Sequence, residues 1–197
     1  MLKFETLFLK LIQSPKFLLT FLIGGLLCFV PILHFFAFGY LFFLTKKIAT
    51  EGSFEYPEWT DFPNLFIKGI ELTAISIIFL ILPFLLFKGM QSLLDSIGLS
   101  ALSSLLSSFL FLIAMPFLAS VLYRYQTSND MRSLFNLSEL FQMSASFFQS
   151  NVIVLLTGFA ITQLFIPLYG FSIFGSLLIL LSYSSIYFSY LEIHSSK

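Results

Sequence analysis

The sequence predicts an all-α, polytopic integral membrane protein with about six transmembrane helices, and three observations lead to that prediction. First, 58% of the 197 residues are hydrophobic and only 10% are charged, whereas soluble domains carry about 25% charged residues. Second, the mean hydropathy is +0.96. Third, charged residues divide the chain into four apolar blocks, each long enough for at least one span of about 20 residues. The expected arrangement is two proline-tipped hairpins flanking two single spans, with amphipathic helices on the membrane surface.

The charged and reactive residues argue against several other classes of protein. Ten Lys and Arg balance ten Asp and Glu, and the basic residues form no stripe that would bind nucleic acid. The single cysteine, Cys28, excludes a disulfide framework and a cysteine-rich metal centre. The sequence contains no phosphate-binding loop and no His-Glu-x-x-His pair. We therefore expect one membrane domain, residues 1–197, with no enzymatic activity, cofactor, metal or nucleic-acid partner.

The first expected element is an interfacial helix, residues 1–13. Lys3 and Lys10 lie on one helical face and apolar residues lie on the other, which is typical of a helix that rests flat on a membrane surface. Ser14 and Pro15 can cap and begin the next helix. A cleaved signal peptide is the alternative, but no small-x-small cleavage site follows.

Residues 15–48 are predicted to form the first hairpin, which turns near Pro31. Its apolar block, residues 17–45, would be about 43 Å long as one helix, too long for a straight crossing of a core about 30 Å thick. Proline interrupts a helix because it lacks a backbone donor. The hairpin either crosses the membrane twice or dips in as a re-entrant pair, and both alternatives place the loops on the same sides. His34 lies at its outer tip.

Two single spans are predicted next, residues 63–88 and 100–124. Asp61 lies just before the first span, where a carboxylate favours the positive end of the helix dipole. The preceding acidic loop contains Trp59, whose ring is expected at the level of the lipid headgroups. The carboxylates of this loop lack the spacing of a calcium-binding loop, so we expect a solvated loop.

A second interfacial helix is expected over residues 131–149, which connect the second span to the last hairpin. Its apolar residues recur at three-, four- and seven-residue spacings, a pattern typical of an amphipathic helix. They are Leu134, Leu137, Phe141 and Phe148.

Residues 151–193 are predicted to form the last hairpin, which turns at Pro167. This hairpin resembles the first one, because Pro31 matches Pro167 and Gly39 matches Gly175 with the same interval of eight residues. A glycine two turns from the tip allows close helix approach. An internal duplication and a coincidence of composition remain as the two interpretations.

The positive charges predict which side of the membrane each loop faces. Lysine and arginine concentrate in cytoplasmic loops. In a six-helix arrangement nine of the ten basic residues are cytoplasmic and only Lys88 is outside, whereas a five-helix arrangement places four inside and six outside. We therefore expect both termini in the cytoplasm.

The candidate functional polar residues are Glu71, Gln163 and His34. Glu71 lies about one turn inside its predicted span and three residues after Lys68, which is the geometry of a helical ion pair. A paired carboxylate and a proton or cation site are the two interpretations, because ionisable groups in spans are costly. Gln163 fits an interhelical contact. His34 has no second ligand, which argues against a metal site.

The first 70 residues also resemble a known family. Pro15-Lys16 precedes the first apolar run, Pro31 interrupts it, and Gly39-Tyr40 and the run Pro57-Glu58-Trp59-Thr60-Asp61 follow. This pattern resembles the uncharacterised prokaryotic membrane family called domain of unknown function 4013, and the resemblance continues loosely over nearly the whole chain. It implies a small polytopic protein of the prokaryotic cytoplasmic (inner) membrane and supplies no activity, ligand or catalytic residue.

Two functions remain open at this point. The first is a non-enzymatic accessory, scaffold or assembly protein, whose partners are the lipid bilayer and other membrane protein subunits. The alternative is a small transporter or lipid-handling protein with a polar path near Glu71 and Gln163. The first is favoured because ion-coupled transport needs more buried polar groups than this sequence offers.

Overall fold

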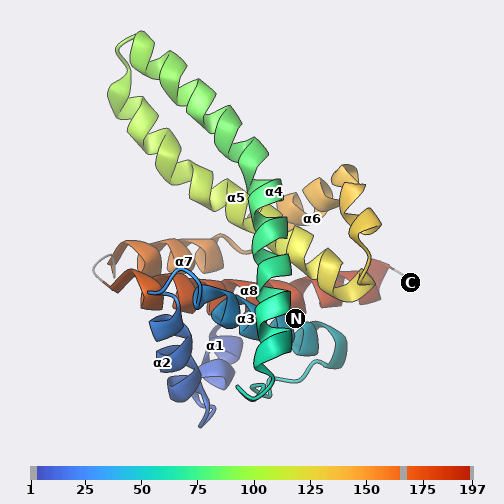
Figure 1. Cartoon of the computed structure of the whole chain (residues 1–197). Helices are drawn as coiled ribbons and strands as arrows, with labels where there is room; N and C mark the ends of the chain where they lie inside the picture. Colours follow the sequence, from blue (N-terminus) through green and yellow to red (C-terminus); the bar gives the residue numbers. More distant parts are fainter. Residues whose placement is uncertain (1–3, 165–167, 196–197) are drawn as a thin grey trace.

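A computed structural model describes residues 4–164 and 168–195, and these residues form helices and connecting turns without any strand (Figure 1). The all-α class is therefore confirmed. The helices are α1 (Phe4–Ile12), α2 (Phe17–Leu27), α3 (His34–Glu51), α4 (Phe62–Ser96), α5 (Ser100–Ser128), the 3-10 helix η1 (Met131–Phe135), α6 (Leu137–Ser150), α7 (Val152–Leu164) and α8 (Tyr169–Ser195).

Three helix breaks lie near the residues that predict them, whereas α2 begins at Phe17 after Lys16 and not at Pro15 after a Ser14 cap. Pro31 lies between α2 and α3. The carboxylate of Asp61 caps α4, because it accepts hydrogen bonds from the backbone N–H of Asn64 at 3.4 Å and from Asn64 Nδ2 at 2.6 Å. Pro167 lies outside the described residues, between α7 and α8.

Two described helices are long and apolar enough to cross a membrane. They are α4 and residues Tyr169–Glu192 of α8, and the α6–α7 pair meets the same criterion only as a span bent by 85°. Helix α2 has 11 residues, about 16 Å at 1.5 Å per residue, and is too short to cross alone. The described residues thus contain two or three candidate spans, fewer than the predicted six.

Helix α8 forms the centre of the fold. It packs against α2, α3, α5 and α7, and most of its apolar length is buried. Figure 1 shows α8 crossing behind α4 with α7 beside it. Phe174, Leu178 and Phe188 are among its fully covered side chains. Asn151 lies at the bend between α6 and α7. Its Oδ1 accepts a hydrogen bond of 2.9 Å from the Tyr183 hydroxyl of α8, which connects the bend to α8.

Two glycines bring α3 and α4 into backbone contact. A Cβ atom added to Gly39 would overlap the carbonyl oxygen of Leu65, and one added to Gly69 would overlap the carbonyl oxygen of Phe35. The two contacts are reciprocal, since each helix supplies a glycine and, four residues away, a carbonyl. Close approach of this kind permits weak Cα–H···O contacts between the helices. Gly175, the counterpart of Gly39, instead lies against the Phe21 ring of α2.

The predicted surface helix 131–149 differs from the structure in its boundaries and in its buried face. It is divided at Asn136 into η1 and α6. Leu134, Leu140 and Phe147 are the buried apolar residues, whereas the others of the predicted apolar face are exposed. The reason is that α6 packs against α5, α7 and α8. Those contacts bury Leu140 and Phe147, one position before Phe141 and Phe148 of the predicted apolar face.

The outer halves of α4 and α5 form an arm that extends away from the other helices (Figure 1). We define the arm by residues 84–102, the part of these halves whose side chains are described. It includes the turn between α4 and α5 at Gly98, where φ is +79°. Most of its large apolar side chains are exposed. They are Phe84, Leu85, Leu86, Met90, Leu93, Ile97, Leu99 and Leu102.

The glycine contact generates the first prediction. Replacement Gly39→Ala should lower the free energy of unfolding by about 1–3 kcal/mol, because the added methyl forces two backbones apart. Thermal unfolding in detergent, followed by circular dichroism, measures the change. Gly89→Ala in α4 is the matched control, since its Cβ would meet no atom within 4 Å. Equal melting temperatures for the two variants would contradict the close contact.

Candidate functional site at the end of α5

The candidate site is built by four consecutive residues in the last turns of α5, Tyr123 to Gln126. Successive residues on an α-helix are rotated by about 100°, so these four side chains leave the helix in four directions. Figure 1 shows the lower half of α5 passing α4, α6 and α8. Each of the four side chains meets a polar group of another helix. We call these residues and their partners the α5 cluster.

Glu71, the candidate residue in α4, is part of this cluster. Lys68 Nζ lies 2.6 Å from Glu71 Oε2, and the hydroxyl of Tyr125 donates a hydrogen bond of 2.7 Å to the same oxygen. The Lys68 ammonium also lies 5.5 Å from the centroid of the Phe42 ring, within the range of a cation–π interaction. The sequence predicted the ion pair, and the structure adds the tyrosine. Glu71 is therefore a paired carboxylate in this structure.

Two carboxylates hold the neighbouring guanidinium. Arg124 forms ion pairs of 2.8 Å with Glu139 in α6 and 3.2 Å with Glu192 in α8. The hydroxyl of Tyr123 donates to the second oxygen of Glu192 at 3.0 Å. Arg124 Nε is buried without a hydrogen-bond partner, but both terminal nitrogens face carboxylates. These contacts connect α5 to α6 and α8.

The fourth member connects α5 to α3. Gln126 Nε2 donates a hydrogen bond of 2.7 Å to Thr45 Oγ1, and the exposed fractions of these residues are 2% and 0%. The hydroxyl of Thr45 in turn donates to the carbonyl of Leu41 in its own helix at 2.7 Å. A buried amide is costly to leave unpaired, so this contact fixes the distance between α3 and α5.

Sequence analysis did not identify Tyr123, Arg124, Tyr125 or Gln126 as site residues. Most of their partners lie 54 to 81 positions away in the chain, as the Tyr125–Glu71 and Gln126–Thr45 separations show, and Glu139, the nearest of the charged partners, belongs to a different helix from Arg124. The one available signal is the run of four polar or aromatic residues at the end of an apolar block. Such a run is equally typical of an interfacial belt, and it does not reveal its partners.

The loop before α4 forms a separate packed unit. Trp59 stacks on Tyr40 with ring centroids 4.0 Å apart, and the hydroxyl of Tyr40 donates to the carbonyl of Pro57 at 3.0 Å. Trp59 therefore covers α3, and its expected role at the headgroup level stays a prediction. Glu55 is bound to Lys47 at 2.7 Å, and the hydrogen bond from that ammonium holds the pKa of Glu55 below its ordinary value.

His34, another candidate residue, lies away from the α5 cluster. His34 is the first residue of α3, and its ring lies 4.2 Å from the Phe35 ring by centroids. Among residues 4–164 and 168–195, no group of three or more His, Cys, Asp or Glu could hold a metal ion. Gln163 belongs to α7, and its side chain is outside the described part of the structure. Of the two candidates whose side chains are described, the structure therefore brings Glu71 into the cluster and not His34.

The α5 cluster is a set of interhelical hydrogen bonds and ion pairs. Each carboxylate of the α5 cluster faces a cation or a hydroxyl donor, so its charged groups are paired with one another. It links α5 to α3, α4, α6 and α8 through side chains alone. Its contribution is to hold five helices in one arrangement.

Comparison with known proteins identifies one family. A family model described as "Protein of unknown function (DUF4013)" matches residues 17–188, from the start of α2 into the last turns of α8. The matched segment includes Glu71 and the four residues of α5. No curated protein and no solved structure matches the chain.

The α5 cluster generates the second prediction. Glu71→Gln and Tyr125→Phe should each lower the free energy of unfolding by about 1–2 kcal/mol, because each leaves a polar group without its partner. The double variant should lose clearly less than the sum, since Tyr125→Phe removes the hydrogen bond between the two side chains and Glu71→Gln removes the charge that strengthens it. Thermal or denaturant unfolding in detergent measures the cycle.

The control for this cycle is Asp95→Asn, which changes an exposed carboxylate near the end of the same helix. It should leave stability within experimental error. Strict additivity of Glu71→Gln and Tyr125→Phe would show that the two side chains do not interact, and would contradict the cluster.

Proposed function

This chain belongs to the DUF4013 family, whose function is unknown, and from that premise we propose a non-enzymatic role for it in the prokaryotic cytoplasmic membrane. The role is that of an accessory, scaffold or assembly protein that binds other membrane protein subunits. The proposal rests on residues of this chain, because the family description names no activity.

The observation that carries the proposal is the pairing of the polar groups. Glu71, the candidate for ion coupling, is held by Lys68 and Tyr125. Arg124 is held by Glu139 and Glu192. Groups that bind a transported ion must exchange partners during the cycle, whereas these groups already bind one another. Such pairing favours a fixed framework over a polar path.

The exposed arm supports the same proposal. Leu86 and Leu93 are 61% and 68% exposed, and α4 satisfies the length and hydropathy of a membrane span. Contiguous apolar surface of this kind requires a cover of lipid or protein. An arm within the bilayer offers a partner subunit a long apolar edge.

We also propose the six-helix topology, with both termini in the cytoplasm. It is supported by the placement of nine of ten basic residues on one side. The interruption between α2 and α3 at Pro31 and the one between α7 and α8 are further support. A hairpin that crosses the membrane twice and a re-entrant hairpin both leave the loops at its two ends on the same side, and only the crossing hairpin presents its tip outside.

The partner proposal predicts a stable complex. The protein extracted from its own membrane in mild detergent should carry another membrane protein at fixed stoichiometry, measured by native mass spectrometry. Leu86→Ala combined with Leu93→Ala should reduce the complex at least several-fold, because truncation removes apolar contact from the arm.

The matched control for the arm is Ile67→Ala combined with Ile70→Ala, which truncates exposed residues of α4 outside the arm. It should retain the complex. A wild-type protein that is isolated as a single chain and binds a small molecule saturably would overturn the scaffold role in favour of transport.

The topology predicts which loops an impermeant reagent reaches. In a Cys28→Ser background, a cysteine replacing Leu33 should react with an impermeant maleimide added outside intact cells. A cysteine replacing Ser53 should react only after the membrane is opened, because its loop faces the cytoplasm in the six-helix arrangement. Labelling of the Ser53 position from outside would reject this topology.

A further inference from the structure

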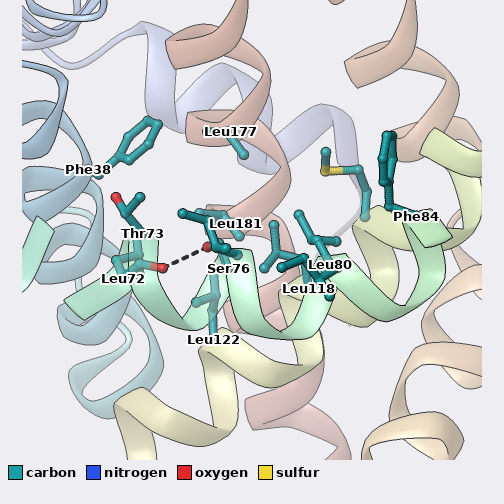
Figure 2. Close-up of a pocket in the computed structure, with 13 residues that line it drawn as sticks. Phe38, Leu72, Thr73, Ser76, Leu80, Phe84, Leu118, Leu122, Leu177 and Leu181 are labelled. Atoms are coloured by element: carbon teal, nitrogen blue, oxygen red, sulfur yellow. Dashed lines mark hydrogen bonds between the residues drawn. The ribbon is translucent and has the colours of Figure 1, made fainter. Parts of the chain in front are cut away.

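A cavity of about 450 Å³ lies between α4, α5 and α8. Figure 2 shows it as an elongated space, with Phe38 and Leu72 toward one end and Phe84 at the other. Because 1.5 Å separates successive residues of a helix, the segment from Leu72 to Phe84 is about 18 Å long. The cavity is therefore long as well as large, a shape that fits a chain better than a compact ring system.

The walls of the cavity offer hydrocarbon and no charge. Among the described residues that line it, Thr73 and Ser76 are the only ones that carry a hydroxyl. Their hydroxyls donate to carbonyls of α4 itself. The Thr73 hydroxyl donates to Gly69 at 2.8 Å, and the Ser76 hydroxyl donates to Leu72 at 2.7 Å, the bond drawn in Figure 2. A space lined in this way binds water poorly, because water needs several polar partners. The chemistry of the walls selects an apolar occupant.

The cavity has a buried floor and an exposed rim. Leu118 and Leu122 of α5 form part of the floor, with exposed fractions of 5% and 2%. Ile77, Ile81 and Phe84 of α4 form the rim, with exposed fractions of 54%, 52% and 49%. The opening therefore lies on the apolar face of a candidate span, where an occupant reaches it from the side.

One end of the cavity approaches the α5 cluster. Residues four apart share one face of a helix, so Lys68 continues the line of Leu72 and Ser76 along α4. On α5, Tyr125 follows Leu122 by three residues on the same face. Lys68 and Tyr125, the polar residues that continue these two rows of side chains, both bind Glu71. The cavity is thus apolar along its length and polar beyond one end.

We propose that this cavity binds one hydrocarbon chain of a membrane amphiphile, with the polar end of that molecule directed toward Lys68 and Tyr125. The chain enters sideways past Ile77 and Ile81. The inference rests on the proposed placement of α4 in the bilayer and extends it, since the occupant is a lipid chain held inside the protein in addition to the lipid around it. A phospholipid and a free fatty acid both supply such a chain.

Photolabelling of the reconstituted full chain tests the proposal. The protein is placed in phosphatidylcholine vesicles that contain a trace of either a phospholipid or a free fatty acid with a diazirine on its chain, and adducts are located by peptide mass spectrometry. Adducts on Leu118 and Leu122 are expected, because a bound chain reaches this buried floor. The probe that gives them identifies the source of the chain.

A variant that fills the cavity tests whether the labelling of Leu118 and Leu122 depends on the cavity. Ser76→Phe places a ring in the cavity and should reduce floor adducts at least tenfold. Ala74→Phe is the matched control, since it adds the same ring two residues away on an exposed position that does not line the cavity. It should label as the wild type does. Circular dichroism and gel filtration check that both variants fold, and Ser76→Leu replaces Ser76→Phe if the larger side chain is not tolerated.

The same experiment separates the two ideas. Adducts on exposed residues of α4, such as Ile78 and Leu85, report whether the helix lies in the bilayer, and their absence would overturn that placement. Adducts on Ile78 and Leu85 with none on the floor would overturn the chain-binding site while leaving the placement intact. Equal floor labelling in wild type and Ser76→Phe would also overturn it, because the label would not depend on the cavity.

Discussion

The hydrogen bond from the Tyr125 hydroxyl to the Glu71 carboxylate joins the two longest helices, and the surrounding structure depends on contacts of this kind. Helices α4 and α5 have 35 and 29 residues, and apolar packing alone would let such helices slide past one another. A carboxylate in an apolar environment must be paired. Its fixed distances of 2.6 and 2.7 Å to Lys68 and Tyr125 therefore set the register between the two helices.

The rest of the cluster extends this constraint to the other helices. Gln126 secures α3 through Thr45, and Arg124 secures α6 and α8 through Glu139 and Glu192. Because these four side chains come from about one turn of α5, a small displacement of that turn strains several contacts at once. The cavity lies directly beside this turn, so its width is governed by the same contacts.

The sequence predicted those features that depend on neighbouring residues. The all-α class follows from composition, the break at Pro31 follows from a missing backbone donor, and the placement of Asp61 at the start of α4 follows from its position just before a predicted span. The Lys68–Glu71 pair follows from helical spacing. Contacts between distant segments were not predictable in this way. Glu192 and Tyr123 are 69 residues apart, and no local pattern encodes which helices will meet.

Helix α4 contains a proline between the part that packs on α3 and the part that forms the arm. The first turns of α4 pack closely on α3, where Gly39 and Gly69 bring the two backbones together, and its outer half belongs to the arm (Figure 1). Pro83 lies inside the helix and removes one backbone hydrogen bond near the start of the arm, so bending is easiest there. Bending of α4 at Pro83 would therefore move the arm and leave the contacts of Gly39, Gly69 and Glu71 in place.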